Sequence, residues 1–350
     1  MPCASGRYGL QFGQSQPVSA LANSPLKRPA RLGQTARPSS FRNARHFISR
    51  RATNFAAQSH FRGTRHLRAA LRLAQKGLDA LDKSGAIFNA PESLAVLGVG
   101  KNMVGAIRHW LLTTRLAREA GHGRVEATDL GRRLFADDGW DTFWEDEATS
   151  WLLHWQLAGP DSPSFTWAYT FNVFREWEWS RAALIDAVLG ATHSLSRVPS
   201  RETVDRDVSC LLQCYAAPGG SLGDDLDCPL RALGLIRPLG KGFRFQIEAK
   251  PTLPAAVFYY ALTRFWNWKW ADARTLTVWE ICYGEGSPGQ VFKLTENAVY
   301  DYLDGLESAT QGRLRFEDTA QNRQVVLGDE DVVPLEFLEA FYAARRGVLQ

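Results

Sequence analysis

The sequence predicts a mostly helical protein with small β-hairpin wings. Apolar residues recur at helical spacing over much of the chain, glycine-containing turns separate pairs of such segments, and short hairpin patterns follow those pairs. At 350 residues, with 45% hydrophobic and 11% aromatic residues, the chain is long enough for two or three domains with substantial cores.

The first 55 residues differ in composition from the rest. Residues 1–60 contain nine lysines and arginines and no acidic residue. Removing those nine from the 41 basic residues leaves 32 against 37 acidic residues, so the folded part is mildly acidic. We interpret residues 1–55 as a disordered basic arm or an over-extended start, with a transit peptide and a DNA-tracking arm as alternatives.

Residues 56–137 are predicted to form a winged helix-turn-helix domain that binds DNA. An amphipathic helix with a basic outer face is expected over residues 66–81. A short helix follows, with Pro91 at its first turn and Gly98 at its end. A glycine hairpin and a short closing helix complete the winged-helix order.

The stretch "LGVGKNMVGAIRHWL" contains the turn of this motif. A phosphate-binding loop is excluded there, because Ala95 and Asn102 stand in place of its first glycine and its magnesium-binding hydroxyl. Residues 98–100 instead form a three-residue turn between two helices. The second helix would present its polar N-terminal face to base edges, and the arginines of the wing would contact phosphates. The predicted DNA-binding residues are Lys101, Asn102, Arg108, Arg124, Arg132 and Arg133.

A winged helix that serves only protein contacts remains the alternative for this domain. The wing arginines and Lys101 favour DNA.

Residues 138–245 are predicted to form a helical, aromatic-rich domain. Closely spaced acids at its start can hold Mg²⁺ for phosphodiester cleavage, but helix N-termini also attract acids because of the helix dipole. Glu145, Asp146 and His154 are the candidate catalytic residues. A structural role for the histidine is the alternative. No nucleotide or organic cofactor is expected.

The cysteines indicate a reducing compartment. Cys3, Cys210, Cys214, Cys228 and Cys282 are odd in number and widely spread, which is not the pattern of a disulfide framework. The three in the middle do not have zinc spacing and are expected to be buried. No run approaches the length of a membrane span, so we expect a cytoplasmic protein without membrane contact.

Residues 246–330 resemble a second, weaker winged helix, and residues 331–350 are expected to form a C-terminal helix or tail. One hairpin is predicted within "PLGKGFRFQIEAKPTLP", at the boundary, and another around residues 319–322. The basic positions of this second unit are Lys293, Arg313, Arg315 and Arg323.

In this order, five motifs resemble the bacterial SspB-like family of single-stranded DNA phosphorothioation: "LGVGKNMVGAIRHWL", "WEDEATSWLLHWQL", "FNVF", "DCPLRALGLI" and "GSPGQVFKL". The resemblance runs from about Phe61 to about Leu327. It implies a DNA-nicking subunit of a phage-defence system that works beside a cysteine desulfurase, an ATPase and an ATP-pyrophosphatase-like sulfur-transfer enzyme. At residues 63–67 this chain reads "GTRHL" where the family has a Gly-His-Glu-Thr-Phe type segment.

Two main hypotheses follow. In the first, the protein is a metal-dependent nicking endonuclease in which Glu145 and Asp146 hold Mg²⁺. In the second, it binds double-stranded DNA without cutting and recruits the sulfur-transfer partners, as the altered segment at 63–67 would allow. A transcriptional repressor that binds a palindrome is a third option, and a homodimer is compatible with each.

Overall fold

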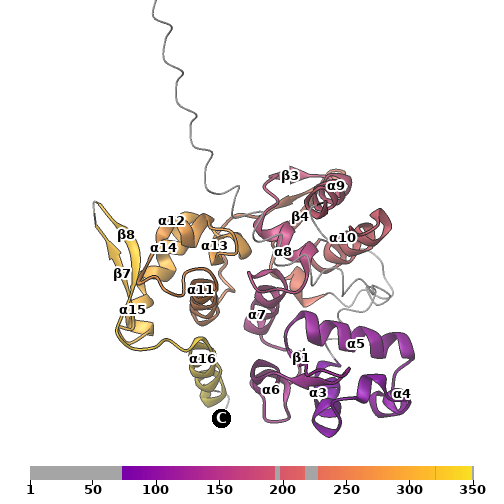
Figure 1. Cartoon of the computed structure of the whole chain (residues 1–350). Coiled ribbons are helices and arrows are strands. Elements are labelled where there is room, and N and C mark those ends of the chain that lie inside the picture. The colour runs from indigo at the N-terminus through magenta and orange to yellow at the C-terminus, as the bar shows by residue number, and fades with distance from the viewer. Residues whose placement is uncertain (1–72, 194–197, 217–227, 320, 349–350) are drawn as a thin grey trace, which may run out of the picture. The chain divides into compact units, whose positions relative to one another are not determined.

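The computed structural model describes residues 73–193, 198–216, 228–319 and 321–348 (Figure 1). All of them belong to one compact unit, Ser40–Gln350. These residues form a mostly helical protein with three small antiparallel sheets, as the sequence predicts. The basic arm, the segment at 63–67 and the start of the expected 66–81 helix lie outside the described residues.

Three successive segments share an order of elements: a helix, an extended segment, further helices, and a β-hairpin. We call them the N-terminal module (residues 74–135), the middle module (165–245) and the C-terminal module (255–327). The N-terminal module consists of α3 (Ala74–Lys83), a 3-10 turn η2 (Ile87–Asn89), α4 (Ser93–Leu97), α5 (Lys101–Thr113), β1 (Ala117–Glu119), β2 (Val125–Ala127) and α6 (Asp129–Phe135).

The turn between α4 and α5 forms where the sequence predicts it. Gly98 ends α4 with a φ of 67°, a left-handed conformation that glycine adopts at little cost. The predicted hairpin is β1–β2. Its Val125 amide donates to the Gly85 carbonyl at 2.7 Å, directly after Ser84, which is the extended residue that follows α3 in this module. The Thr128 hydroxyl caps α6 by accepting from the Gly131 amide at 3.1 Å.

The middle module contains more β-structure than the sequence indicates. Its sheet has the order β3-β5-β4, and Figure 1 shows β3 and β4 beside α9 and α10. The hairpin predicted before residue 254 is β4–β5, but β3 has only two residues, too few for an alternating pattern. Its elements are α8 (Phe165–Asn172), β3 (Glu178–Trp179), α9 (Arg181–Thr192), α10 (Arg201–Tyr215), a 3-10 turn η3 (Pro229–Arg231), β4 (Ile236–Leu239) and β5 (Gly242–Phe245).

The C-terminal module repeats the same sheet order, first strand, third strand, second strand, as β6-β8-β7. The hairpin predicted around residues 319–322 is confirmed as β7–β8, which projects from α15 in Figure 1. The elements are α11 (Ala255–Lys269), β6 (Thr275–Thr277), α12 (Val278–Tyr283), α13 (Pro288–Val291), α14 (Glu296–Asp304), α15 (Leu306–Ala309), β7 (Leu314–Asp318) and β8 (Arg323–Leu327).

Two further helices connect the modules. Helix α7 (Glu147–Ala158) is buried from Ala148 to its end, which is typical of a helix that is covered on all sides. Helix α16 (Pro334–Val348) packs on α11, and its Tyr342 stacks on Trp140 with ring centroids 5.1 Å apart. No helix in the described part of the chain is both long and apolar enough to span a bilayer.

Candidate nucleic-acid interface and adjacent pocket

Helix α5 has an apolar face toward the core and a polar face toward solvent. Val104, Ile107 and Leu111 are buried. Lys101 and Asn102 are exposed at the N-terminus of the helix. A Cβ placed on Gly105, in the next turn, would meet no atom within 4 Å, so nothing in the described part of the chain covers this face there. The first turn of α5 is therefore open to a ligand.

Arg108, the third residue expected on this face, is directed to the wing. One guanidinium nitrogen lies 3.0 Å from a carboxylate oxygen of Glu119 in β1. Its Nε is buried and has no hydrogen-bond partner among the described residues. Arg108 thus connects α5 to the hairpin, and a ligand would have to displace Glu119 to bind it fully.

Of the other predicted DNA-binding arginines, two are paired with carboxylates and one is not. Arg132 lies 3.7 Å from Asp82, and Arg133 lies 2.9 Å from Glu339 and over the ring of Trp140. Arg124 is exposed, and within the described chain neither it nor Lys101 has an ion pair. Exposed ion pairs such as those of Arg132 and Arg133 stabilise a folded protein by roughly 0–1 kcal/mol. A DNA phosphate can therefore replace the carboxylate at low cost.

Two of the candidate catalytic residues lie at the N-terminus of α7. Glu145 is exposed. Asp146 is the N-cap: its Oδ1 accepts from the Ala148 amide at 2.8 Å, and its Oδ2 lies 2.5 Å from Arg345. Asp141 accepts from the amides of Glu145 and Asp146. Asp146 therefore has the capping role at the positive end of a helix that the helix-dipole alternative describes.

His154 lies two turns further along α7, about 12 Å from Asp146 by the rise of a helix. It is fully buried. Its Nε2 donates to the Val291 carbonyl at 2.9 Å, so the neutral ring accepts at Nδ1 from the Tyr215 hydroxyl at 2.7 Å. Burial lowers the pKa of His154 to about 3. The structure does not bring it to Glu145, and these contacts favour the structural alternative.

Three of the four basic positions expected in the C-terminal module have hydrogen-bond or ion-pair partners within the protein. Lys293 is buried and donates to the Phe171 carbonyl at 2.8 Å, and burial lowers its pKa to about 7. Arg313 pairs with Glu336 at 2.7 Å, and Arg323 pairs with Asp318 at 3.1 Å. Arg315 is exposed.

The carboxylates do not form a ready metal site. In the described residues, no group of three or more histidine, cysteine, aspartate and glutamate side chains is placed to hold a metal ion. Both oxygens of Asp146 already have partners, so of the three neighbouring acids only the exposed Glu145 and Glu147 could offer a carboxylate to a metal ion. Of the cysteines in the described residues, Cys210, Cys214 and Cys282 are buried and Cys228 is half-buried, and these four form no disulfide.

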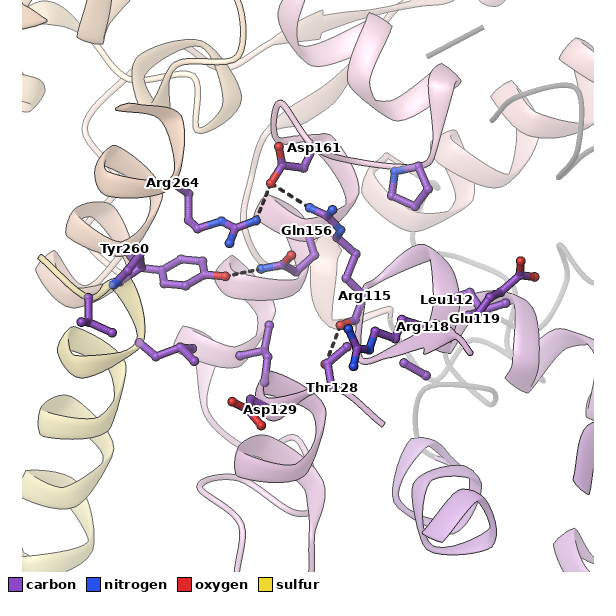
Figure 2. A pocket seen from close by; sticks show the side chains of 16 residues that line it. Leu112, Arg115, Arg118, Glu119, Thr128, Asp129, Gln156, Asp161, Tyr260 and Arg264 are labelled. Carbon is purple, nitrogen blue, oxygen red and sulfur yellow. Dashed lines mark hydrogen bonds and ion pairs between the residues drawn. The ribbon is translucent and has the colours of Figure 1, made fainter. Parts of the chain in front are cut away.

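A pocket of about 540 Å³ lies beside the wing (Figure 2). Arg115 and Arg264 both contact Oδ2 of Asp161, the former at 2.9 Å. Burial alone would raise the pKa of Asp161, but the two arginines outweigh it and the pKa is lowered. Arg115 has a φ of 59°, an unusual conformation for a residue other than glycine. The Tyr260 hydroxyl, one turn before Arg264 on α11, accepts from the Gln156 amide at 3.0 Å (Figure 2).

Sequence reasoning did not find this pocket. Arg115, Asp161 and Arg264 lie up to 149 positions apart along the chain and share no motif. The one local signal is the position of Arg115 directly after Thr114, the C-cap of α5, where glycine is the usual residue.

One protein family and two solved structures match most of this chain. Residues 66–342 match a family described as "Protein of unknown function (DUF4007)". The chain is similar to two crystal structures, described as "Magnesium ion-bound SspB crystal structure" and "SspB crystal structure", with TM-scores of 0.69 and 0.68 and identities of 24% and 25%. Each similarity covers 77% of this chain and 84% of the other. A comparison with curated protein sequences found no match.

Proposed function

The chain belongs to the DUF4007 family, and from this membership and its SspB-like fold we propose that it is a DNA-binding component of a DNA phosphorothioation system. The resemblance of the sequence motifs to SspB-like proteins supports this pathway independently of the fold. The proposed partners are double-stranded DNA and the cysteine desulfurase, ATPase and ATP-pyrophosphatase-like proteins that such a system implies. The cytoplasm is the proposed location.

The repeated element order supports a winged-helix identity for the modules. A winged helix combines a helix, a first strand, a helix-turn-helix pair and a two-stranded hairpin. In its three-stranded sheet, the last strand of the hairpin lies between the first strand and the other hairpin strand. The sheets β3-β5-β4 and β6-β8-β7 have that order, and the Gly85–Val125 contact supplies its counterpart in the N-terminal module. We assign α5 as the recognition helix of the N-terminal module.

The exposed N-terminus of α5 is the observation that carries the proposal. Lys101 and Asn102 have no ion pair or hydrogen bond to another described side chain, and they lie at the helix end that recognition helices present to DNA. A lysine there suits a backbone phosphate, and an asparagine suits the edge of adenine. The positive end of the helix dipole adds to the attraction for phosphate.

A duplex-binding measurement with Lys101→Ala tests this function. Removing one phosphate contact should weaken duplex binding severalfold and reduce the slope of log K against log salt by about 1. Lys83→Ala is the matched control, because Lys83 is also exposed on a helix of the N-terminal module but lies at the C-terminus of α3. Equal affinities and salt slopes for the two variants would remove α5 from the interface.

Introduction or positioning of a single-strand nick is a second candidate function. It is favoured by the similarity to a structure described as magnesium-bound and by a pocket of about 450 Å³ that Glu145, Asp146, Glu147 and Arg345 line. Because Asp146 has both oxygens engaged, binding is the function that the present geometry supports better.

A plasmid-relaxation assay with and without Mg²⁺ separates the two. Nicked circles that require Mg²⁺ and are lost in Glu145→Ala would establish cleavage, with Glu92→Ala as the control because Glu92 is exposed at α4. Plasmid that stays supercoiled while the protein binds it would leave a binding or adaptor role.

A further inference from the structure

The three hairpins place an arginine at the same position but give it different partners. The first strand of each begins with a buried apolar residue, followed by Arg118 in β1, Arg237 in β4 and Arg315 in β7. The register sets Arg118 opposite Glu126 and Arg315 opposite Val326. Arg237 lies opposite Arg244. Like charges directly opposite each other destabilise a strand pair, so the middle hairpin carries a cost that the other two avoid.

This arginine pair lies on the outer face of the middle sheet. The buried residues Trp179, Ile236 and Phe245 alternate with it along the three strands and point inward. Lys241, in the turn between β4 and β5, is exposed as well. In the described chain, none of Arg237, Lys241 and Arg244 has a carboxylate within ion-pair distance, whereas Arg118 lies 2.6 Å from Glu126.

The carboxylates near this face offset only part of its charge. Glu178 is aligned with Arg244 across the sheet, but its Oε1 accepts from the Trp177 indole at 3.2 Å. Glu248 follows β5 and pairs with Lys250 at 3.4 Å. Burial lowers the pKa of Lys250, Glu248 partly opposes this shift, and the nearby charge of Arg237 adds to it. Arg237, Lys241 and Arg244 thus outnumber the two carboxylates, and the face keeps a net positive charge.

An exposed aromatic side chain lies at the edge of this surface, where its indole N–H contacts Glu178. Trp177 is 55% exposed, and its hydrogen bond to Glu178 fixes one edge of the indole. Arginines with free N–H groups bind phosphate oxygens, and an exposed indole stacks with an unpaired base. A duplex keeps its bases stacked on one another, so the tryptophan gives a single strand an advantage that a duplex does not have.

We propose that the outer face of the middle sheet, with Arg237, Lys241 and Arg244 for phosphates and Trp177 for a base, binds a single strand of DNA. This surface is separate from the N-terminus of α5. It rests on the proposed DNA-binding function and adds a second contact to it, for the strand that is exposed when a duplex is opened at the modification site.

The test measures fluorescence anisotropy of labelled 20-nucleotide single strands and 20-base-pair duplexes against the full chain over a range of salt. The double variant Arg237→Gln/Arg244→Gln should lower the magnitude of the single-strand salt slope by about 1.4, because each phosphate contact contributes about 0.7. Trp177→Ala should weaken single-strand binding about tenfold. Arg315→Gln is the matched control, since Arg315 occupies the same position in β7.

The outcomes separate this proposal from the proposed function. Single-strand binding by the wild type that the double variant and Trp177→Ala leave unchanged would overturn the surface and leave the function standing. No binding of either form of DNA by the wild type would overturn both. Duplex binding that is severalfold weaker in Lys101→Ala, with single-strand binding unchanged, would support two distinct contacts.

A thermal melt tests whether the double variant loses single-strand binding only because the protein is less stable. The double variant should melt at or above the wild-type temperature, because it removes the repulsion between Arg237 and Arg244. A variant that melts lower and loses single-strand binding in proportion would assign the pair to folding and refute the proposal.

Discussion

Replacing Asp207 by asparagine should make the protein less sensitive to pH over the range in which this buried carboxyl titrates. Asp207 lies in α10 and is 1% exposed. Its Oδ2 accepts from the Thr166 hydroxyl at 3.1 Å, and its Oδ1 has no partner among the described residues. Burial raises its pKa from 3.8 to about 7, although the hydrogen bond from Thr166 opposes the shift. The folded protein therefore keeps a proton that the unfolded chain releases.

The sign and size of the effect follow from this difference. Between pH 4 and pH 7 the unfolded state binds about one proton fewer, so the free energy of unfolding falls by roughly 1.4 kcal/mol per pH unit, or about 4 kcal/mol in total. Below pH 4 both states are protonated, and above pH 7 both are ionised, so the effect is flat outside this window. Asparagine keeps the shape of the side chain and removes the ionisation.

Urea denaturation followed by tryptophan fluorescence, at half-unit intervals from pH 4 to pH 8.5, measures the effect. The stability of the variant minus that of the wild type should rise up to pH 7 and then level off. Asp205→Asn is the control, because Asp205 is in the same helix but is partly exposed and paired with Arg181 at 2.7 Å. A difference between Asp207→Asn and the wild type that stays constant with pH would mean that Asp207 is ionised in the fold, and would refute the reasoning.

Two other substitutions test the packing of the modules. Gly131→Ala should lower the free energy of unfolding by roughly 1–3 kcal/mol in urea denaturation, because the new Cβ would overlap the Leu116 carbonyl oxygen. In the same measurement Gly105→Ala, whose Cβ meets nothing, should gain up to about 1 kcal/mol from helix propensity. An equal effect of the two would contradict the close packing of α6 on the start of β1. His154→Gln should be destabilising at pH 8, and its deficit should shrink as the pH falls below 6.5, because the wild-type histidine, with its pKa lowered to about 3, stays neutral while the unfolded chain takes up a proton. A deficit that urea denaturation finds unchanged between pH 8 and pH 5 would show that His154 is not held neutral.

Local patterns were sufficient for the helix–turn–helix segment and for the hairpins. Gly98 predicts the end of α4 because glycine adopts its left-handed conformation without a Cβ clash. The 3.6-residue period of α5 predicts that Lys101 and Asn102 face solvent, since Val104, Ile107 and Leu111 must be buried. The family resemblance, carried by five motifs, predicted the SspB-like fold that the comparisons bear out.

The partners of the charged side chains could not be predicted in this way. Arg108 and Arg133 carry the same signal in the sequence as Lys101, but Glu119 and Glu339 neutralise them, and the second of these carboxylates lies 206 positions away. His154 falls within the same motif as Glu145 and Asp146, but the fold places it in the core between Tyr215 and Val291.

The sequence by itself determined which segments are helices, where they turn, and which face of α5 is polar, because these properties depend on residues within a few positions of one another. Tertiary structure alone decided which cations remain without a carboxylate. Ion pairing requires that two side chains lie within about 4 Å of each other, and the register of β4 and β5 sets Arg237 beside Arg244 rather than beside an acid. The surface that we propose for single-stranded DNA therefore became visible only in the folded chain.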